Sequence, residues 1–176
     1  LVVEGFESGD FDTFEWSHPS NQDWTIETSE TYAGNYSAKS GSIGNQQNSQ
    51  LVLNIEVVAD GQVSFFKKVS SENNYDFLTF YINGNEMSSW SGEDDWSEES
   101  YDITAGNHEL KWTYSKDYSM SSGSDCAWID EILLPGASTI ESDLVLVNNN
   151  SLDFGEVNVG QTGSLPIMIS NFGNDT

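Results

Sequence analysis

Apolar and polar residues alternate in short segments along most of the first 136 positions, and Gly, Asn, Asp and Ser bound these segments. Helical spacing of three and four residues is almost absent, whereas a period of two is typical of a strand with one buried face. The pattern predicts nine strands: Leu1–Glu7, Trp24–Glu27, Tyr36–Ser40, Gln50–Val57, Gly61–Val69, Phe77–Ile82, Ser97–Ile103, Asn107–Tyr114 and Ala127–Leu134.

Turn signals support the breaks between these strands. Ala59-Asp60-Gly61, Asn83-Gly84 and Ala105-Gly106-Asn107 carry the residues that tight turns prefer. Many short strands joined in this way predict an all-β chain in which two antiparallel sheets pack together. We therefore expect an antiparallel β-sandwich of the jelly-roll type.

The composition of the chain changes after Pro135-Gly136. Residues 137–143 are mostly small, polar or acidic and are predicted to be a linker between a first domain, residues 1–136, and a second segment, residues 144–176. That segment holds the strand-like stretches Leu144–Val147, Ser151–Phe154 and Ser164–Ser170 but is too short for a core of its own. It is predicted to be the opening of a second domain.

The last predicted strand of the first domain contains an anomaly. Cys126, Trp128, Asp130, Ile132 and Leu134 lie at period two, so in a regular strand they share one face, with an acid among apolar residues. A buried carboxylate is costly unless it is paired, hydrogen-bonded or bound to a metal. Because the chain has only 5 lysines and arginines, a cation from solution is the first partner to consider.

Charge narrows the range of partners. The chain has 29 acids and a net charge of −24, which repels nucleic-acid phosphates and anionic lipid surfaces. We expect no nucleic-acid binding and no membrane insertion, and no run of 18 apolar residues is present. The single cysteine, Cys126, lies close to Trp128 and is expected to be a small buried apolar group, not a nucleophile.

Three stretches of the first domain together resemble a known family. They are Gly5–Phe11 followed by Trp24–Ile26, then Tyr32–Ser40, and finally Ser124–Ile132. They resemble the MAM-like and cleaved-adhesin-like jelly-roll modules of bacterial surface and secreted proteins, over residues 1 to about 136. The resemblance implies an extracellular or cell-surface location.

The C-terminal segment resembles a second family. Leu152–Thr162, followed by Ile169–Gly173, is similar to the start of an ASH or Hydin-type immunoglobulin-like domain, of which only the first strands are present. Such domains commonly act as spacers or anchors. This resemblance implies that the parent protein is large, modular, exported and bacterial.

The first resemblance implies a structural calcium ion. In similar modules the ion lies where the first strand passes the last, held by a Glu shortly after the first strand and an Asp of the final strand, positions that Glu7 and Asp130 occupy. Calcium takes six to eight oxygen ligands at about 2.3–2.6 Å, and carbonyls of the Ser29–Asn35 loop could complete the set. The alternative is that Asp130 accepts hydrogen bonds from backbone amides.

Aromatic residues beside acids suggest a ligand site. Trp90 and Trp96 bracket an acidic segment that includes Glu93 and Asp94, and Tyr118 lies at a strand end or in a loop. An exposed ring stacks on the apolar face of a sugar while neighbouring carboxylates accept hydrogen bonds from its hydroxyl groups. The alternative is that both tryptophans are core residues, as Trp112 and Trp128 are expected to be.

Two functions therefore remain open. The first is a non-catalytic extracellular binding module, with a polysaccharide or glycan as its partner. The second is an adhesive or structural module that binds protein or self-associates through strand pairing of the C-terminal segment. Catalysis is not expected, because the chain has no Gly-x-Ser-x-Gly, His-Glu-x-x-His or phosphate-binding motif.

Overall fold

The computed structural model describes residues 2–139. The chain divides into two units, Leu1–Ile140 and Glu141–Thr176, and the described residues all belong to the first. The predicted immunoglobulin-like segment, residues 144–176, and the last part of the predicted linker lie outside the described residues.

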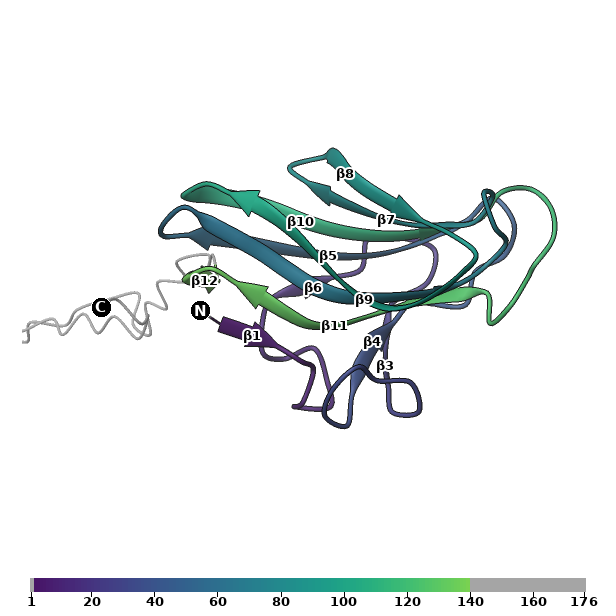
Figure 1. The fold of residues 1–176 in the computed structure, drawn as a ribbon, viewed down its shortest axis with the longest axis horizontal. Coiled ribbons are helices and arrows are strands. Elements are labelled where there is room, and N and C mark those ends of the chain that lie inside the picture. The colour runs from purple at the N-terminus through teal and green to yellow at the C-terminus, as the bar shows by residue number, and fades with distance from the viewer. Residues whose placement is uncertain (1, 140–176) are drawn as a thin grey trace, which may run out of the picture. The chain divides into compact units, whose positions relative to one another are not determined.

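The described residues form an all-β structure with no helix, and hence no helix long enough to cross a membrane. The strands are β1 (Val2–Glu4), β2 (Trp16–Ser17), β3 (Thr25–Glu27), β4 (Ser37–Lys39), β5 (Asn48–Val57), β6 (Gly61–Ser70), β7 (Phe77–Ile82), β8 (Asn85–Trp90), β9 (Glu93–Ile103), β10 (Gly106–Ser115), β11 (Cys126–Leu134) and β12 (Ala137–Thr139), labelled where there is room in Figure 1.

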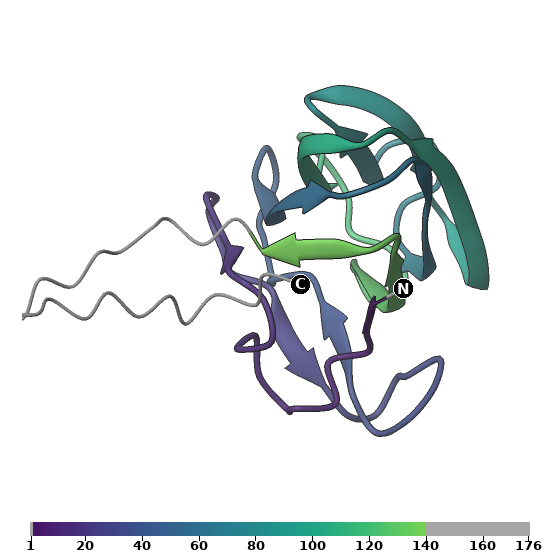
Figure 2. The ribbon, with the colours of Figure 1, turned by 90° about the vertical axis from the view of Figure 1, so that its left-hand side faces the viewer.

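The strands form two antiparallel sheets of six strands each. The first sheet has the order β3-β4-β11-β6-β9, with β1 beside β11, and the second has the order β12-β5-β10-β7-β8, with β2 beside β5. Figures 1 and 2 show the two sheets layered against each other. The predicted fold class, an antiparallel β-sandwich of jelly-roll type, is confirmed for residues 2–139.

The core lies between the sheets and is built from alternate residues of the long strands. Phe65 of β6 lies edge-on to Phe80 of β7, with ring centroids 4.8 Å apart, and to Trp112 of β10, at 5.3 Å. All three side chains are fully buried. The prediction that Trp112 is a core residue is confirmed, and Phe66, the next residue after Phe65, must face outward.

All nine predicted strands are present, with bounds shifted by a few residues. Three others were not predicted. Of these, β8 is a mostly polar and exposed edge strand, and β2 has only two residues. The third, β12, pairs with β5 through Ala137 and Val57, so the predicted linker begins with a strand.

A β-bulge in β11 resolves the anomaly at Asp130. Asp130 pairs with Phe66, whereas Leu133 pairs with Ser64, so β11 has one more residue than β6 between these pairs. Glu131 has a φ of 46°, in the left-handed region. The extra residue shifts the alternation of inner and outer positions by one.

The prediction that the five alternating residues of β11 share one face is therefore wrong. Before the bulge, Ile129 points into the core, and after it Ile132 does, so Asp130 lies on the outer face of the first sheet. Trp128 lies on the same outer face. It is 5% exposed but does not belong to the core between the sheets, and the Lys39 ammonium lies 5.6 Å from the centre of its ring.

Candidate functional site

The Asp130 carboxylate is fully buried beneath the loop that joins β3 to β4. Its Oδ2 accepts hydrogen bonds from the main-chain N–H groups of Tyr32, at 2.9 Å, and Ala33, at 3.1 Å, and its Oδ1 accepts one from Glu131, at 2.8 Å. Burial raises the pKa of Asp130, although the three amide bonds oppose this shift. Among the described residues no lysine pairs with Asp130, so this anion is held by backbone dipoles.

Glu7 holds the other end of the same loop. Its Oε1 accepts hydrogen bonds from the main-chain N–H groups of Asn35, at 2.8 Å, and Tyr36, at 3.0 Å, and the Asn35 bond is the main cause of its lowered pKa. Gly34 has a φ of 61°, and a Cβ at this position would clash with the Glu7 carboxylate, so a larger residue would be strained there. The two carboxylates thus fix residues 32–36 from both sides.

The predicted calcium ligands are therefore close to the same loop, and their oxygen donors are of the kind that calcium binds. A buried Asp130 without a cationic partner also fits a site for a cation. In residues 2–139, however, the only acids that bring three carboxylates within 4.8 Å of one another are Glu72, Asp76 and Asp117, at another place. Calcium at Glu7 and Asp130 stays a prediction.

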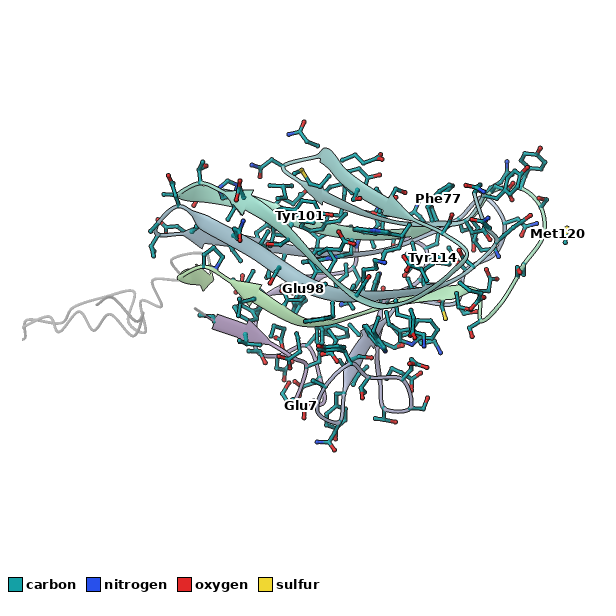
Figure 3. All side chains as sticks on the ribbon, in the orientation of Figure 1. Glu7, Phe77, Glu98, Tyr101, Tyr114 and Met120 are labelled. Carbon is teal, nitrogen blue, oxygen red and sulfur yellow. The ribbon has the colours of Figure 1, made fainter. Side chains whose placement is uncertain are left out.

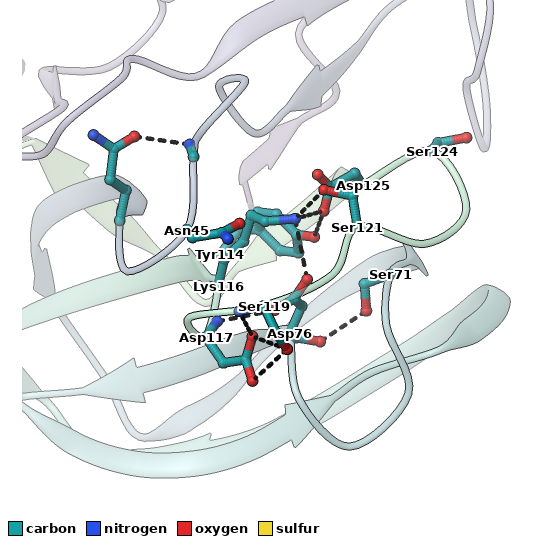
Figure 4. Close-up of polar contacts among 12 residues, drawn as sticks. Asn45, Ser71, Asp76, Tyr114, Lys116, Asp117, Ser119, Ser121, Ser124 and Asp125 are labelled. Atoms are coloured by element: carbon teal, nitrogen blue, oxygen red, sulfur yellow. Dashed lines mark hydrogen bonds and ion pairs between the residues drawn. The ribbon is translucent and has the colours of Figure 1, made fainter.

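The cluster of Glu72, Asp76 and Asp117 already contains a lysine. Asp76 is fully buried, its Oδ2 lies 3.2 Å from Lys116 Nζ, and its Oδ1 accepts a hydrogen bond from the Asp117 N–H at 3.0 Å. Lys116 also pairs with Asp125, as Figure 4 shows. Burial by itself lowers the pKa of Lys116, but the two aspartates raise it above its ordinary value. This network locks the loops at one end of the sandwich together.

Tyr118 lies in the loop between β10 and β11 at this end. It is 76% exposed, and its carbonyl accepts a hydrogen bond from the Asn45 side chain at 3.1 Å. Met120, labelled in Figure 3, is exposed in the same loop. In the described residues, no hydrogen bond or ring contact joins Tyr118 to either of the two candidate tryptophans.

Trp90 differs from the expected exposed ring. It is partly buried and packs against the core, with its ring centroid 6.2 Å from that of Phe65. The Lys67 ammonium lies 5.3 Å from the centre of the Trp90 ring and pairs with Asp94. Trp90 therefore closes the edge of the sandwich and shields a buried lysine.

Glu93 and Asp94 lie at the start of β9. Together with Lys68, Val69 and Asp95 they line a depression of about 250 Å³. Asp94 is engaged by Lys67, so Glu93 and Asp95 are the more accessible acids on this rim.

Trp96 belongs to an aromatic cluster on the outer face of the first sheet. The ring of Tyr32 lies parallel to that of Phe66, with centroids 3.6 Å apart and an interplanar angle of 11°, and the centroid of Trp96 lies 6.1 Å from that of Tyr32. Tyr32 is 46% exposed, and the other two rings are partly buried. We call Tyr32, Phe66 and Trp96 the aromatic platform.

Charged groups border the aromatic platform. Glu30 Oε1 accepts hydrogen bonds from Trp96 Nε1, at 3.2 Å, and from Lys68 Nζ, at 3.0 Å. Lys68 also lies 3.3 Å from Asp95, and these contacts raise the pKa of Lys68. Glu98, labelled in Figure 3, pairs with Phe66 across β6 and β9. The platform thus combines an exposed ring with several hydrogen-bond acceptors.

Two of the three platform residues, Tyr32 and Phe66, were not predicted as ligand contacts. A signal for Phe66 existed, because Phe65 and Phe66 are adjacent in a strand and only one of them can face the core. Tyr32 gave no such signal, since its position depends on the distant Asp130.

The single cysteine and the two histidines are buried or hydrogen-bonded within the fold. Cys126 is buried, as expected, and burial raises the pKa of its thiol to about 11. His18 Nδ1 accepts a hydrogen bond from the Trp24 N–H at 3.2 Å, and burial lowers its pKa. His108 contacts the Asn83 side chain at 2.9 Å.

Comparisons with known proteins identify the fold. No protein-family model matches the chain, and no curated protein matches it. The carbohydrate-binding module TmCBM61, solved in complex with beta-1,4-galactotriose, is 17% identical, covers 74% of this chain and 92% of its own, and has a TM-score of 0.53. The K1 cleaved adhesin domain of Lys-gingipain from Porphyromonas gingivalis W83 is 15% identical, covers 74% of this chain and 95% of its own, and has a TM-score of 0.55.

A third structure contains the same sandwich within a larger protein. The secreted serine protease VesC from Vibrio cholerae is 17% identical and has a TM-score of 0.55, and the match covers 76% of this chain but 28% of VesC. At these identities the likenesses show a shared β-sandwich fold.

Proposed function

We propose that this chain contains a non-catalytic, extracellular carbohydrate-binding module whose contact surface is the aromatic platform. The observation that carries the proposal is the ring of Tyr32, 46% exposed and held parallel to Phe66. A ring fixed in this way offers a flat apolar surface to a pyranose, and Glu30 and Asp95 offer acceptors to its hydroxyl groups.

The platform is fixed before a ligand arrives. Asp130 and Glu7 hold the loop that carries Tyr32 through four main-chain N–H groups, and stacking on Phe66 fixes the ring. Because little conformational entropy is then lost on binding, even a small contact surface can give useful affinity.

The known structures that share the fold lend support. TmCBM61 was solved with a galactotriose, the gingipain domain is named an adhesin, and VesC is named a secreted protein. A binding module of an extracellular protein agrees with all three. Among the residues predicted as ligand contacts, the proposal keeps Trp96 as part of the platform and Glu93 on the depression that Lys68 and Asp95 also line, and it gives Trp90 and Asp94 a structural role.

We further propose a structural calcium ion at Glu7 and Asp130, where oxygen donors converge on residues 32–36. The ion would supply the positive charge that the buried Asp130 lacks. In this proposal calcium stabilises the loop that positions Tyr32 and takes no direct part in sugar binding.

The alternative of self-association through the C-terminal segment, residues 144–176, falls outside the described residues, which bear only on pairing between the sheet edges of the first unit. One edge of the first sheet is β9, in which six of eleven residues are acidic: Glu93, Asp94, Asp95, Glu98, Glu99 and Asp102. Two such edges repel each other, which is how many proteins avoid edge-to-edge pairing. A strict monomer in light scattering at high protein concentration would count against self-association altogether.

Binding to a panel of immobilised polysaccharides in calcium-containing buffer tests the proposal. We expect the native protein to bind at least one polysaccharide, and Trp96→Ala to lose that binding while its Tm stays close to native. Tyr118→Ala, which removes an exposed ring outside the platform, serves as the matched control and should bind normally. A panel without any binding, or equal losses in both variants, would reject the platform as the sugar site.

A further inference from the structure

We infer that the aromatic platform selects uncharged glycans and excludes polysaccharides that carry carboxylate, sulfate or phosphate groups. This inference rests on the proposed function and narrows its ligand to one chemical class. It follows from the charges that surround the platform and from the positions of all the cations of the chain.

The chain has no free cation at the platform. Its positively charged side chains are five lysines, all among the described residues. Four of them are ion-paired: Lys39 with Glu27, Lys67 with Asp94, Lys68 with Glu30 and Asp95, and Lys116 with Asp76 and Asp125. The fifth, Lys111, belongs to the second sheet and lies 4.6 Å from the centre of the Tyr81 ring.

Lys68, the lysine beside the platform, already pairs with two carboxylates. Lys68 Nζ lies 3.0 Å from Glu30 and 3.3 Å from Asp95, so this group of three side chains has a net charge of −1. An anionic ligand at this ammonium would lie beside both carboxylates, whose combined charge exceeds that of the lysine. Proteins that recognise carboxylate or sulfate groups do so with unpaired Arg or Lys side chains, and the platform has no such side chain.

Further acids extend the negative field along the edge of the platform. Glu93 and Glu98 are exposed on β9, and Glu98 pairs directly with Phe66. The Debye length is about 8 Å at physiological ionic strength, so acids bordering a bound sugar act on it with little screening. A carboxylate on that sugar would therefore be repelled by several charges at once.

An uncharged sugar is not repelled by these acids and can form hydrogen bonds with them. Its hydroxyl groups donate hydrogen bonds, and the carboxylates of Glu30, Asp95 and Glu98 are acceptors, which form stronger bonds than neutral acceptors do. The charges that exclude an anionic glycan therefore help to bind a neutral one.

The test uses chemically matched derivatives of the neutral polysaccharide that binds best in the panel. One portion is carboxymethylated and another is hydroxyethylated to the same degree of substitution, so that the two differ in charge more than in size. Affinities are measured for the native protein and for Glu98→Lys, which places an unpaired cation beside Phe66, in buffers with low and with high salt.

We expect the carboxymethyl derivative to bind roughly tenfold more weakly than the hydroxyethyl derivative at low salt, and the gap to shrink at high salt and in Glu98→Lys. Equal or tighter binding of the carboxymethyl derivative, including binding bridged by added calcium, would overturn the inference while leaving the proposed function intact. Failure of every polymer, neutral or charged, to bind would instead reject the proposed function.

Discussion

The carboxylate of Asp130 accepts a hydrogen bond from the main-chain N–H of Tyr32, at 2.9 Å, across a sequence separation of 98 residues. This bond joins the last long strand of the sandwich to a loop near its beginning. An acid that looked misplaced in an apolar row thus holds the most exposed ring of the platform in position, and Asp130 is a positioning residue in the proposed site.

Removal of calcium should destabilise the protein through Asp130. If the ion binds at Glu7 and Asp130, a hundredfold excess over its Kd adds about 2.7 kcal/mol to the free energy of unfolding. We therefore expect EDTA to lower the Tm of the native protein and to leave that of Asp130→Asn almost unchanged, as measured by calorimetry. A native Tm that is indifferent to EDTA would remove calcium and leave the amide bonds as the only partners of Asp130.

Lowering the pH should reduce the free energy of unfolding, because Glu27 becomes protonated. Hydrogen bonds from the main-chain N–H of Ser29, then that of Thr28, with Lys39 contributing, lower the pKa of Glu27 to about 2. A depressed pKa gives stability that is present above the ordinary value of 4.5 and is lost as the pH falls towards about 2. The loss should amount to about 2 kcal/mol in urea unfolding, and Glu27→Gln should show a flatter profile over this window. Equal profiles would contradict the assignment.

The protonation of Asp130 should affect stability in the opposite direction. Burial raises its pKa, so the folded state takes up this proton more readily than the unfolded state does, and ionisation of Asp130 costs stability in the absence of calcium. Asp130 therefore does not contribute to acid unfolding. A control titration of Asp130→Asn without calcium should keep the acid loss that Glu27 causes.

The bulge in β11 can be tested with two neighbouring residues. Ile132 is fully buried in the core, and Leu133 is only partly buried. Ile132→Ala should lower the free energy of unfolding by about 2–5 kcal/mol, because it leaves a cavity, and Leu133→Ala by about 1 kcal/mol or less. The reverse order in urea unfolding would mean that the strand continues without the one-residue shift.

The ion pair between the buried residues Lys116 and Asp76 offers a further test. Lys116→Ala leaves the fully buried Asp76 without a cation, and loss of one partner of a buried pair typically costs about 3–5 kcal/mol. Lys111→Ala is the matched control, since Lys111 has no acidic partner among the described residues and should cost about 1 kcal/mol or less. Similar costs for both variants in urea unfolding would contradict the proposed locking of the loops.

Sequence pattern predicted the fold well because alternation directly reports burial. β7 was predicted with its observed bounds, and the other eight predicted strands were off by at most a few residues. β8 was missed because an exposed edge strand such as Asn85–Trp90 has little apolar alternation. The bulge was missed because the run Trp128-Ile129-Asp130-Glu131-Ile132 contains no Gly or Pro that would signal a one-residue shift in strand pairing.

The candidate site was less accessible to prediction, since it depends on contacts between distant segments. Tyr32 becomes part of a platform only because Asp130 and Phe66 hold its loop, and neither contact leaves a local pattern. Trp90 and Trp96 flank the same acidic segment, so the sequence does not distinguish them. In the fold, the ring of Trp90 packs against the core, and that of Trp96 lies on the outer face of the first sheet.

The most direct test of the account is the affinity of Tyr32→Ala for the polysaccharide that the native protein binds, measured by isothermal titration beside Tyr118→Ala. Both variants remove an exposed tyrosine ring, but only Tyr32 lies on the platform. We predict that Tyr32→Ala binds at least about tenfold more weakly, since an aromatic ring in a stacking contact contributes about 1.4 kcal/mol or more, while Tyr118→Ala binds like the native protein. Native affinity in a folded Tyr32→Ala would contradict the central claim and move the search for the sugar site to the loops around Tyr118.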